Sequence, residues 1–289
     1  MAPQVWTIMD VLNWTTNYLK SGTSSTPRLD AELLLAYVLE VERIRLYVDH
    51  DKPMMAPELA RFKGLVRQRK GGESVAHITG QKEFWKLRFE TPAPLFVPRP
   101  ETELLVEEAV RMAGESGQIL DLCCGTGAIL VSVVHELPGW QGVGVDQMPL
   151  AAKTATQNAE NAGVADRVTV HCDDAVAFVA SSSQPQFSMI TCNPPYVASA
   201  EWEMLAPEIK VNEPRQAVDG GSDGLDLLRR LLPELPARLA PGGRLLLEYG
   251  GDDQSAVLSQ LLVDTGFANV KILKDYGGID RVAVATVLS

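Results

Sequence analysis

The spacing of apolar residues changes along this chain near residue 100. Before that point, apolar residues recur at helical spacing. Thr26-Pro27 offers a helix cap with a first-turn proline, and a second helical stretch runs from about Pro57 to Lys70, where Gly71-Gly72 stops it. We therefore predict a small helical domain over residues 1–80.

Strand-like alternation of apolar and polar side chains first appears at residues 84–90. The proline-rich stretch TPAPLFVPRP follows it. This pattern predicts a hairpin linker over residues 81–98, between the helical domain and the remainder of the chain.

From residue 99 to 289, short apolar strands alternate with helical segments. The predicted strands are QILDLC, QGVGVD, RVTVHC, FSMITC, GGRLLLEY, ANVKILKD and RVAVATVL. Strands separated by helices of this length form a mostly parallel sheet with helices on both faces, an α/β fold. Such sheets bind ligands beyond the carboxyl ends of their strands. The residues that end each strand are therefore the candidate site.

The first strand ends in a glycine loop. Its candidate residues are Asp121, Cys123, Cys124, Gly125, Thr126 and Gly127. Leu130 stands where a dinucleotide fingerprint needs a third glycine, and the glycine-lysine pair of a triphosphate loop is missing. An acidic residue four places before Gly-x-Gly is similar to the first motif of S-adenosylmethionine methyltransferases. A tight structural turn is the alternative for the glycines alone.

Carboxylates end the next two strands. Asp146 ends the second strand, where it can accept hydrogen bonds from both hydroxyls of a ribose. Asp173 and Asp174 end the third strand, where an acidic group can accept from the amine of an adenine. The alternative for this pair is capping of the following helix. Together with the loop, Asp146 predicts an adenosine cofactor.

The fourth strand ends in the motif Asn193, Pro194, Pro195 and Tyr196. Two prolines fix two φ angles and remove two N–H donors, so the carbonyls around them have no local partner. One such carbonyl and the Asn193 side-chain oxygen would offer two acceptors to an NH2 group. Tyr196 would stack on a planar group. The alternative is a strand that ends in a plain Pro-Pro turn.

This motif predicts methylation of the NH2 nitrogen of a planar group. The lone pair of an amide nitrogen is delocalised, and holding both N–H bonds out of the conjugated geometry localises it. Catalysis would then rest on positioning and on acceptors that gain strength as the nitrogen becomes positive. No dedicated general base is required. The motif does not distinguish glutamine from adenine as the substrate.

The net charge and the cysteine pattern limit which partners and which cellular location we expect for this protein. The net charge of −11 argues against non-specific nucleic-acid binding, although residues 61–70 hold a basic run that is a candidate patch or a solvated helix face. The four cysteines form no Cys-x-x-Cys pair, so we predict no metal site. We see no signal-peptide pattern and no apolar run long enough to span a membrane, and we expect a cytoplasmic protein that binds no membrane.

Four segments together resemble the HemK-like family of peptide chain release factor glutamine N5-methyltransferases. They are GGESVAHITGQKEFWKLRFE, VPRPETELLVEEA, EPRQAVDGGSDGLDLLRRLLPELPARLAPGGRLLLEYG and KDYGGIDRVAVA. The resemblance covers nearly the whole chain. It implies a Rossmann-like, seven-stranded class I methyltransferase domain whose last strand is antiparallel, preceded by a small helical bundle that docks the substrate.

The resemblance also implies the ligands. The cofactor would be S-adenosyl-L-methionine, held by the 123–127 loop, Asp146, Asp174 and Asn193. The substrate would be the glutamine of the Gly-Gly-Gln motif in class 1 peptide chain release factors, held by residues 193–196. Arg99 and Glu101 would either shape the substrate mouth or brace the linker. Two departures stand out: the family usually has glycine at Cys123, and an aromatic residue is common at Asp174.

Three alternatives remain open from the sequence. A sister enzyme methylates a glutamine of a large-subunit ribosomal protein, but lacks the Pro-Glu-Thr-Glu found here at residues 100–103. A nucleic-acid adenine-N6 methyltransferase would need a basic surface and room for a flipped base. A non-catalytic cofactor-binding module is the third, and the set of Asp121, Asp146 and Asn193 argues against it.

Overall fold

The computed structural model describes residues 5–181 and 186–287. The chain divides into two compact units. The first holds the residues up to Gly80 together with Leu205–Glu213, and the second holds Gln81–Met204 with the residues from Pro214 onward. Within the described residues, no helix is long and apolar enough to cross a membrane.

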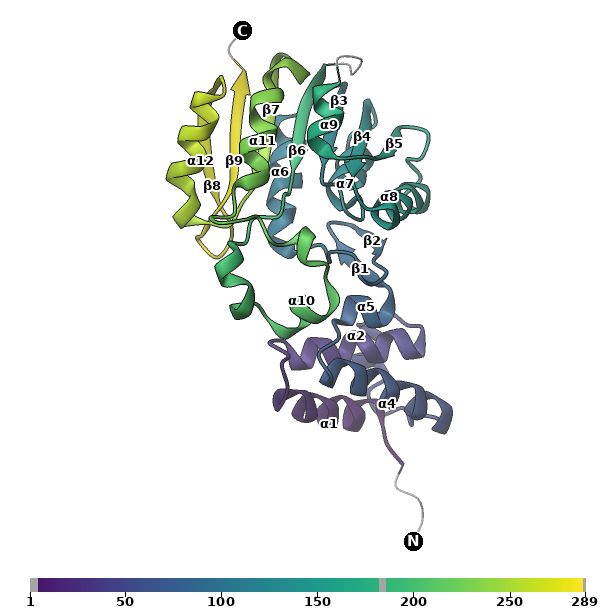
Figure 1. The fold of residues 1–289 in the computed structure, drawn as a ribbon. Coiled ribbons are helices and arrows are strands. Elements are labelled where there is room, and N and C mark those ends of the chain that lie inside the picture. Colours follow the sequence, from purple (N-terminus) through teal and green to yellow (C-terminus); the bar gives the residue numbers. More distant parts are fainter. Residues whose placement is uncertain (1–4, 182–185, 288–289) are drawn as a thin grey trace. The chain divides into compact units, whose positions relative to one another are not determined.

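The first unit is a small helical bundle (Figure 1). Its helices are α1 (Ile8–Lys20), α2 (Pro27–Leu39), α3 (Arg45–Val48), α4 (Ala56–Lys70), α5 (Val75–Thr79) and α10 (Pro207–Asn212). Apolar side chains from α1, α2 and α4 form its core, with Leu12, Leu34 and Leu35 fully buried. Such burial drives a bundle of short helices to fold, because helices of this length are marginal alone.

Helix capping differs from the prediction at α2. Thr26 does occupy the position before the helix, but its side chain makes no capping hydrogen bond. Its hydroxyl donates instead to Asp30 Oδ1 at 3.0 Å. At α1, by contrast, Thr7 and Asp10 cap each other's backbone N–H groups. The local pattern at Thr26 correctly predicted the start of the helix. The Thr26 hydroxyl, however, bonds the Asp30 carboxylate and not a backbone N–H group of the helix.

The helix α10 joins the first unit through a buried arginine. Arg69 Nε lies 2.6 Å from Asp30 Oδ2, and Arg69 Nη2 lies 2.7 Å from Glu208 Oε2. Asn212 Nδ2 also donates to the Gly72 carbonyl at 3.0 Å. A buried guanidinium needs such partners, since an unpaired buried charge is costly. The expected methyltransferase domain of 99–289 therefore has one segment, Leu205–Glu213, that clusters with the helical unit.

The second unit contains a two-stranded hairpin and a seven-stranded sheet. The hairpin strands are β1 (Gln81–Phe84) and β2 (Leu87–Glu90), and the sheet strands are β3 (Gly117–Leu122), β4 (Trp140–Asp146), β5 (Val168–Cys172), β6 (Phe187–Cys192), β7 (Leu239–Glu248), β8 (Phe267–Lys274) and β9 (Asp280–Val287). All seven predicted sheet strands are present. Phe84 and Phe89 of the hairpin are buried in the core of this unit.

The strand order of the sheet is β5-β4-β3-β6-β7-β9-β8. The pairs from β5 to β7 are parallel, and β9 is antiparallel to both of its neighbours, as predicted for the last strand. The chain runs outward from β3 to β5 and then returns to β6 on the other side of β3. Strand order therefore reverses between β3 and β6, where an α/β sheet binds its ligand.

Helices cover both faces of this sheet (Figure 1). One face packs against α9 (Ala175–Ala180), α11 (Asp226–Leu231) and α12 (Asp252–Asp264). The other packs against α6 (Glu103–Met112), α7 (Ala128–Glu136) and α8 (Pro149–Asn161). Side chains along a strand alternate between the two cores, as Ile119 and Leu120 do. The α/β fold predicted from the sequence is confirmed.

Short 3-10 turns complete this unit. They are η1 (Pro100–Thr102), η2 (Ser199–Met204), η3 (Arg215–Ala217), η4 (Leu232–Glu234) and η5 (Pro236–Arg238). The turn η1 matters for the site, because it brings the Pro-Arg-Pro-Glu signature to the start of α6. Arg99, just before it, stacks over the Phe96 ring with its guanidinium carbon 4.8 Å from the ring centre.

Candidate active site

The glycine loop between β3 and α7 is held in left-handed backbone conformations. Gly127 has φ of 79°, and a Cβ there would lie 3.0 Å from the Ala155 Cβ, so only glycine fits without displacement. Cys123, where the family usually has glycine, has φ of 57°. A non-glycine residue pays a steric cost in this region. The departure noted in the sequence therefore falls on a position whose backbone favours glycine.

Asp146, at the end of β4, orients the glycine loop. Its Oδ2 accepts from the Gly125 N–H and its Oδ1 from the Met148 N–H, both at 2.9 Å. Partial burial raises the pKa of this carboxyl, although the two N–H donors pull it down. Each carboxylate oxygen keeps a second lone pair. The side chain can therefore accept hydrogen bonds from a diol while it holds the loop.

Asp121 lies inside the sheet near the end of β3, just before the loop. The side chain is fully buried, and its Oδ1 accepts from the Thr191 hydroxyl at 2.7 Å. Its Oδ2 has no hydrogen-bond partner among the described residues. Burial raises the pKa of Asp121 to about 7. Because Asp121 is fully buried, we expect it to act by fixing the backbone of the loop.

Two further predicted residues of the glycine loop, Cys124 and Thr126, are buried. Cys124 is buried, and burial raises the pKa of its thiol. Thr126 is also buried, and its carbonyl accepts from Asn158 Nδ2 at 2.9 Å. The same Asn158 side chain pairs with both backbone groups of Glu90 on the hairpin. Asn158 thus ties the hairpin to the glycine loop, a role that sequence reasoning missed.

The acidic pair after β5 has a local structural role. Asp174 caps α9, since its Oδ1 accepts from the Ala177 N–H at 2.9 Å. Asp173 is exposed, and its backbone N–H donates to the Asp146 carbonyl at 3.1 Å. The capping alternative for Asp174 is therefore observed. Contact of Asp173 or Asp174 with an adenine stays a prediction.

The four cysteines are free thiols. Cys123 and Cys192 lie beside each other at adjacent strand ends, and this contact together with burial raises the pKa of the Cys192 thiol. Cys172 is exposed, on β5. In the described part of the chain, no group of three or more potential ligands is arranged to hold a metal ion.

The motif Asn193-Pro194-Pro195-Tyr196 follows β6, directly beside the glycine loop on the neighbouring strand β3. Asn193 is half-buried, and its Nδ2 donates to the Thr102 hydroxyl oxygen at 3.3 Å. Within the described residues, its Oδ1 accepts no hydrogen bond. The predicted acceptor is thus present and unused.

A second loop braces the motif from behind. Gly224 has φ of 80°, and a Cβ there would lie 2.0 Å from the Tyr196 carbonyl oxygen. That carbonyl also accepts from Gln254 Nε2 at 2.8 Å, and the Val197 carbonyl accepts from the Gly220 N–H at 2.8 Å. Glycines are needed in the DGGSDG segment, residues 219–224, because its backbone packs directly against the backbone of the Asn193–Tyr196 motif.

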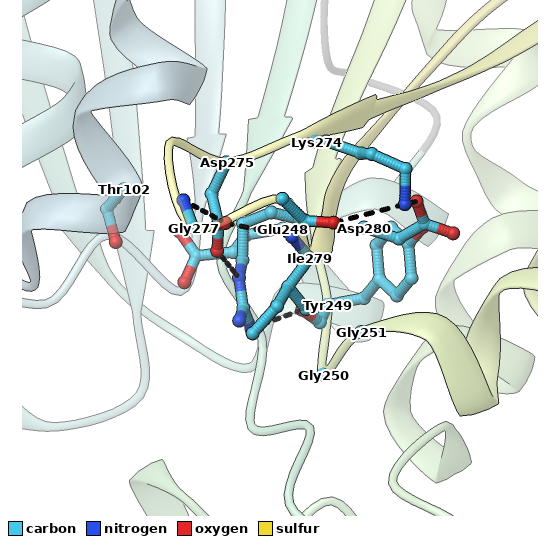
Figure 2. A network of polar contacts seen from close by, with 12 residues as sticks. Thr102, Glu248, Tyr249, Gly250, Gly251, Lys274, Asp275, Gly277, Ile279 and Asp280 are labelled. Carbon is cyan, nitrogen blue, oxygen red and sulfur yellow. Dashed lines mark hydrogen bonds and ion pairs between the residues drawn. The ribbon is translucent and has the colours of Figure 1, made fainter.

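Glu248, the last residue of β7, completes the site and was not predicted. Its carboxylate is fully buried, and Oε1 accepts from the Tyr196 hydroxyl at 3.2 Å. Thr102 lies beside this carboxyl and lowers its pKa. Figure 2 shows Thr102 and Glu248 in the polar network around the end of β7. A signal existed in the sequence: a carboxylate follows three leucines directly at the carboxyl end of a strand.

Arg281 of β9 is held by the turn between β8 and β9 and acts on the charge of Glu248. Arg281 donates to Asp275 Oδ2 at 3.2 Å and to the Tyr249 carbonyl at 3.1 Å. Desolvation raises the pKa of Glu248 to about 7, while Thr102, Tyr196 and Arg281 act to lower it. The KDYGGIDR segment therefore fixes the charge that faces Glu248.

The strand order, the glycine loop, the carboxylate after β4 and the motif after β6 define a class I methyltransferase. Two family models agree with this class. The model described as "Methyltransferase small domain" matches residues 100–222, and the one described as "PrmC N-terminal domain" matches residues 10–80.

Curated relatives specify the family further. The release factor glutamine methyltransferase of Geobacter sulfurreducens is 41% identical, over 97% of this chain and 96% of that protein. Those of Rhodopirellula baltica and Chlorobaculum tepidum are 36% and 33% identical, each over at least 95% of both chains. The chain belongs to the release factor glutamine methyltransferase family, so the resemblance seen in the sequence is confirmed and the chain is a methyltransferase enzyme.

Proposed function

We propose that this enzyme transfers a methyl group from S-adenosyl-L-methionine to the side-chain amide nitrogen, N5, of the glutamine in the Gly-Gly-Gln motif of class 1 release factors. The observation that carries the proposal is the Asn193 side chain. Its Nδ2 is engaged by Thr102 while its Oδ1 is unused, beside the glycine loop. Membership of the release factor glutamine methyltransferase family supports the choice of glutamine over adenine.

The cofactor suits the residues at the β3 and β4 ends. Asp146 is a half-buried carboxylate, already oriented by two backbone N–H groups and still able to accept from a ribose diol. The left-handed loop backbone at Gly125 and Gly127 lets a ligand approach the main chain closely. S-adenosyl-L-methionine, when bound there, supplies an electrophilic methyl group on a sulfonium. Asp173 and Asp174 would face its adenine, and Asn193 would face its methyl-bearing end.

The motif would hold the substrate amide by its two N–H bonds. Asn193 Oδ1 would accept one of them, and a backbone carbonyl of the Pro194-Pro195 turn would accept the other. Held this way, the amide nitrogen loses conjugation and its lone pair points at the methyl carbon. The two acceptors bind more strongly as the nitrogen becomes positive, which lowers the barrier. The extra proton then leaves to water.

Tyr196 would form the wall of the glutamine site. Its hydroxyl is anchored by Glu248, and burial beside that carboxylate raises the pKa of Tyr196, so the phenol stays protonated. An anchored ring presents a fixed apolar face to a planar amide. We assign no proton transfer to it, because its hydroxyl is committed to Glu248.

The helical unit would dock the release factor. Trp14 and Tyr18 of α1 are both exposed, and their rings stack at 5.1 Å between centroids. Exposed, mutually stacked aromatic side chains are typical of protein-binding surfaces. Since the substrate is a translation factor and the four cysteines are free thiols, we also propose that the enzyme acts in the cytoplasm.

The experiment that tests the function is mass spectrometry of a purified release factor after incubation with enzyme and S-adenosyl-L-methionine. We expect a gain of one methyl group on the Gly-Gly-Gln glutamine, absent with Asn193→Ala. A matched control is Asn161→Ala, which changes an exposed asparagine at the end of α8.

The same assay separates the alternatives. A large-subunit ribosomal protein and adenine-containing DNA and RNA are incubated in parallel with the release factor. Methylation of either one in preference to the release factor would overturn the proposal. If the protein binds the cofactor but methylates none of these substrates, the alternative of a non-catalytic cofactor-binding module would be favoured.

A further inference from the structure

The side-chain amide of Gln254 lies where three segments of the second unit meet. Gln254 is in the first turn of α12, and its Nε2 donates to the Tyr196 carbonyl at 2.8 Å and to the Asp223 carbonyl at 2.9 Å. Its Oε1 accepts from the Gly250 N–H at 2.8 Å. One half-buried side chain therefore binds the motif, the 219–224 loop and the residue two positions after the end of β7.

The orientation of this amide is fixed by its partners. Two carbonyls face one end of it and an N–H group faces the other, so only one orientation satisfies all three bonds. Both hydrogens of Nε2 are then in use. Two glycines leave room for this arrangement: a Cβ on Gly224 would lie 2.2 Å from Gln254 Nε2, and one on Gly250 would lie 2.9 Å from Gln254 Oε1.

The pairing of β6 with β7 stops just before the motif, at the last residue of β6. The two prolines that follow have no N–H group to donate, so the backbone cannot continue a regular ladder there. The Gln254 amide makes the next connection, because it links the Tyr196 carbonyl to the Gly250 N–H. In this way one side chain continues the link between the two strands past the prolines.

Capping of α12 does not explain these bonds. The N-cap residue of α12 is Gly251, and the free backbone groups at a helix N-terminus are N–H groups, which need acceptors. The Nε2 atom of Gln254 is a donor. Its two bonds go to residues that lie 58 and 31 positions away in the sequence, on the motif and on the 219–224 loop.

We propose that Gln254 is a positioning residue for methyl transfer, which holds the backbone of residues 193–196 against the end of β7. The proposal rests on the function proposed above, in which the Asn193 side-chain oxygen and a carbonyl of the Pro194-Pro195 turn hold the substrate amide. Both acceptors belong to this one short segment, so a shift of the segment moves both relative to the methyl group. A misplacement of about 1 Å can lower a rate by about a hundredfold.

The test compares Gln254→Met and Gln254→Glu with the wild type. Met keeps the length of the side chain without its hydrogen bonds. Glu keeps the acceptor for the Gly250 N–H but sets a carboxylate oxygen against two carbonyls, where the wild type has a donor. Gln260→Glu is the matched control, because Gln260 is exposed on the same helix and its Nε2 donates to Asp264 Oδ1 at 2.8 Å.

We expect both Gln254 variants to lower kcat on the release factor by about tenfold to a hundredfold. The Kd for S-adenosyl-L-methionine should be unchanged, since the bonds of Asp146 to the glycine loop do not involve Gln254. Gln260→Glu should keep the wild-type kcat. Unchanged kcat in Gln254→Met would overturn the proposal. So would a parallel fall of kcat, cofactor affinity and melting temperature, which a merely structural role would produce.

A second readout needs no substrate. Hydrogen exchange of the free enzyme, followed by NMR, should show the Gly250 and Val197 N–H groups exchanging at least about tenfold faster in Gln254→Met, with the N–H groups inside β7 unchanged. If both groups stay protected in that variant, Gln254 does not hold the motif, whatever the activity. If the wild type fails to methylate the release factor while exchange changes as expected, the proposed function fails and the link through Gln254 stands.

Discussion

The two strands that flank β6 each carry a buried carboxyl group, and the two groups differ in what they hold. Asp121 on β3 and Glu248 on β7 are both 0% exposed, and burial raises the pKa of each to about 7. Each keeps one oxygen without a partner among the described residues. Asp121, however, bonds the buried Thr191 inside the sheet, whereas Glu248 bonds Tyr196 of the motif.

Under the proposed function, this difference separates the sheet into a cofactor half and a motif half. In the cofactor half, β3 and β4 place the glycine loop and Asp146, and the buried carboxyl bonds Thr191 of β6. In the motif half, β6 and β7 place Asn193 and Tyr196, and the buried carboxyl accepts from the Tyr196 hydroxyl. A buried carboxyl therefore bonds a neighbouring strand on one side and anchors Tyr196 of the motif on the other.

The largest effect should come from the motif half. Asn193→Ala removes the side-chain acceptor, and we expect kcat to fall by about 10²- to 10³-fold, as for the loss of one polar group that stabilises a transition state. The Kd for S-adenosyl-L-methionine, measured by calorimetry, should change by less than tenfold. A variant that loses cofactor binding in proportion to kcat would place Asn193 in the cofactor half instead.

The next effect concerns the pH dependence of stability, where both halves should behave alike. A carboxyl whose folded pKa lies above its unfolded value stabilises the fold while protonated, so its contribution is lost as pH rises from about 4 to about 7. The free energy of unfolding of Asp121→Asn relative to the wild type should therefore shift by about 2–4 kcal/mol across this window. Denaturant unfolding at a series of pH values measures it.

A third effect belongs to the cofactor half alone. Asp146→Ala should weaken binding of S-adenosyl-L-methionine by about tenfold to a hundredfold, since hydrogen bonds to a charged group are worth about 1.5–3 kcal/mol each. At saturating cofactor, kcat should change by less than tenfold. Asp166→Ala, an exposed aspartate before β5, is the control and should leave the Kd unchanged. Unchanged affinity in Asp146→Ala would exclude it from the cofactor site.

The smallest effect should follow from Cys123→Gly. Glycine relieves the left-handed backbone at φ of 57° but loses the packing of a half-buried side chain and gains freedom in the unfolded chain. The terms oppose each other, so we expect the free energy of unfolding to change by less than about 1 kcal/mol. Thermal unfolding measures the change. A much larger loss would show that the Cys123 contact with Cys192 stabilises the loop.

Sequence patterns were most informative about local structure. The alternation of apolar runs predicted all seven sheet strands, because a strand buried on both faces must be apolar over its whole length. The glycine loop, Asp146 and Asn193 were found because each follows a strand, and the carboxyl ends of parallel strands lie at one edge. The helix α4 ends where Gly71-Gly72 predicted, since the chain leaves helical geometry at that point.

Contacts between segments distant in sequence were not found in this way. Tyr196 and Glu248 lie 52 residues apart in the numbering, and their side chains meet because β6 and β7 are adjacent in the sheet. Arg69 was grouped with a basic run on a helix, yet it is buried and holds Asp30 and Glu208. A charged residue shows no local sign of which carboxylates will surround it.

The sequence by itself determined the strands, the turns and the chemical groups at the strand ends, because these depend on side chains within a few positions of one another. Only the tertiary structure decided which hydroxyl meets which carboxylate, which carboxyl is buried deeply enough to titrate near neutral pH, and that Leu205–Glu213 packs with the helical unit. The physical reason is that hydrogen-bond partners and desolvation depend on the order of strands in the sheet, which no local pattern encodes.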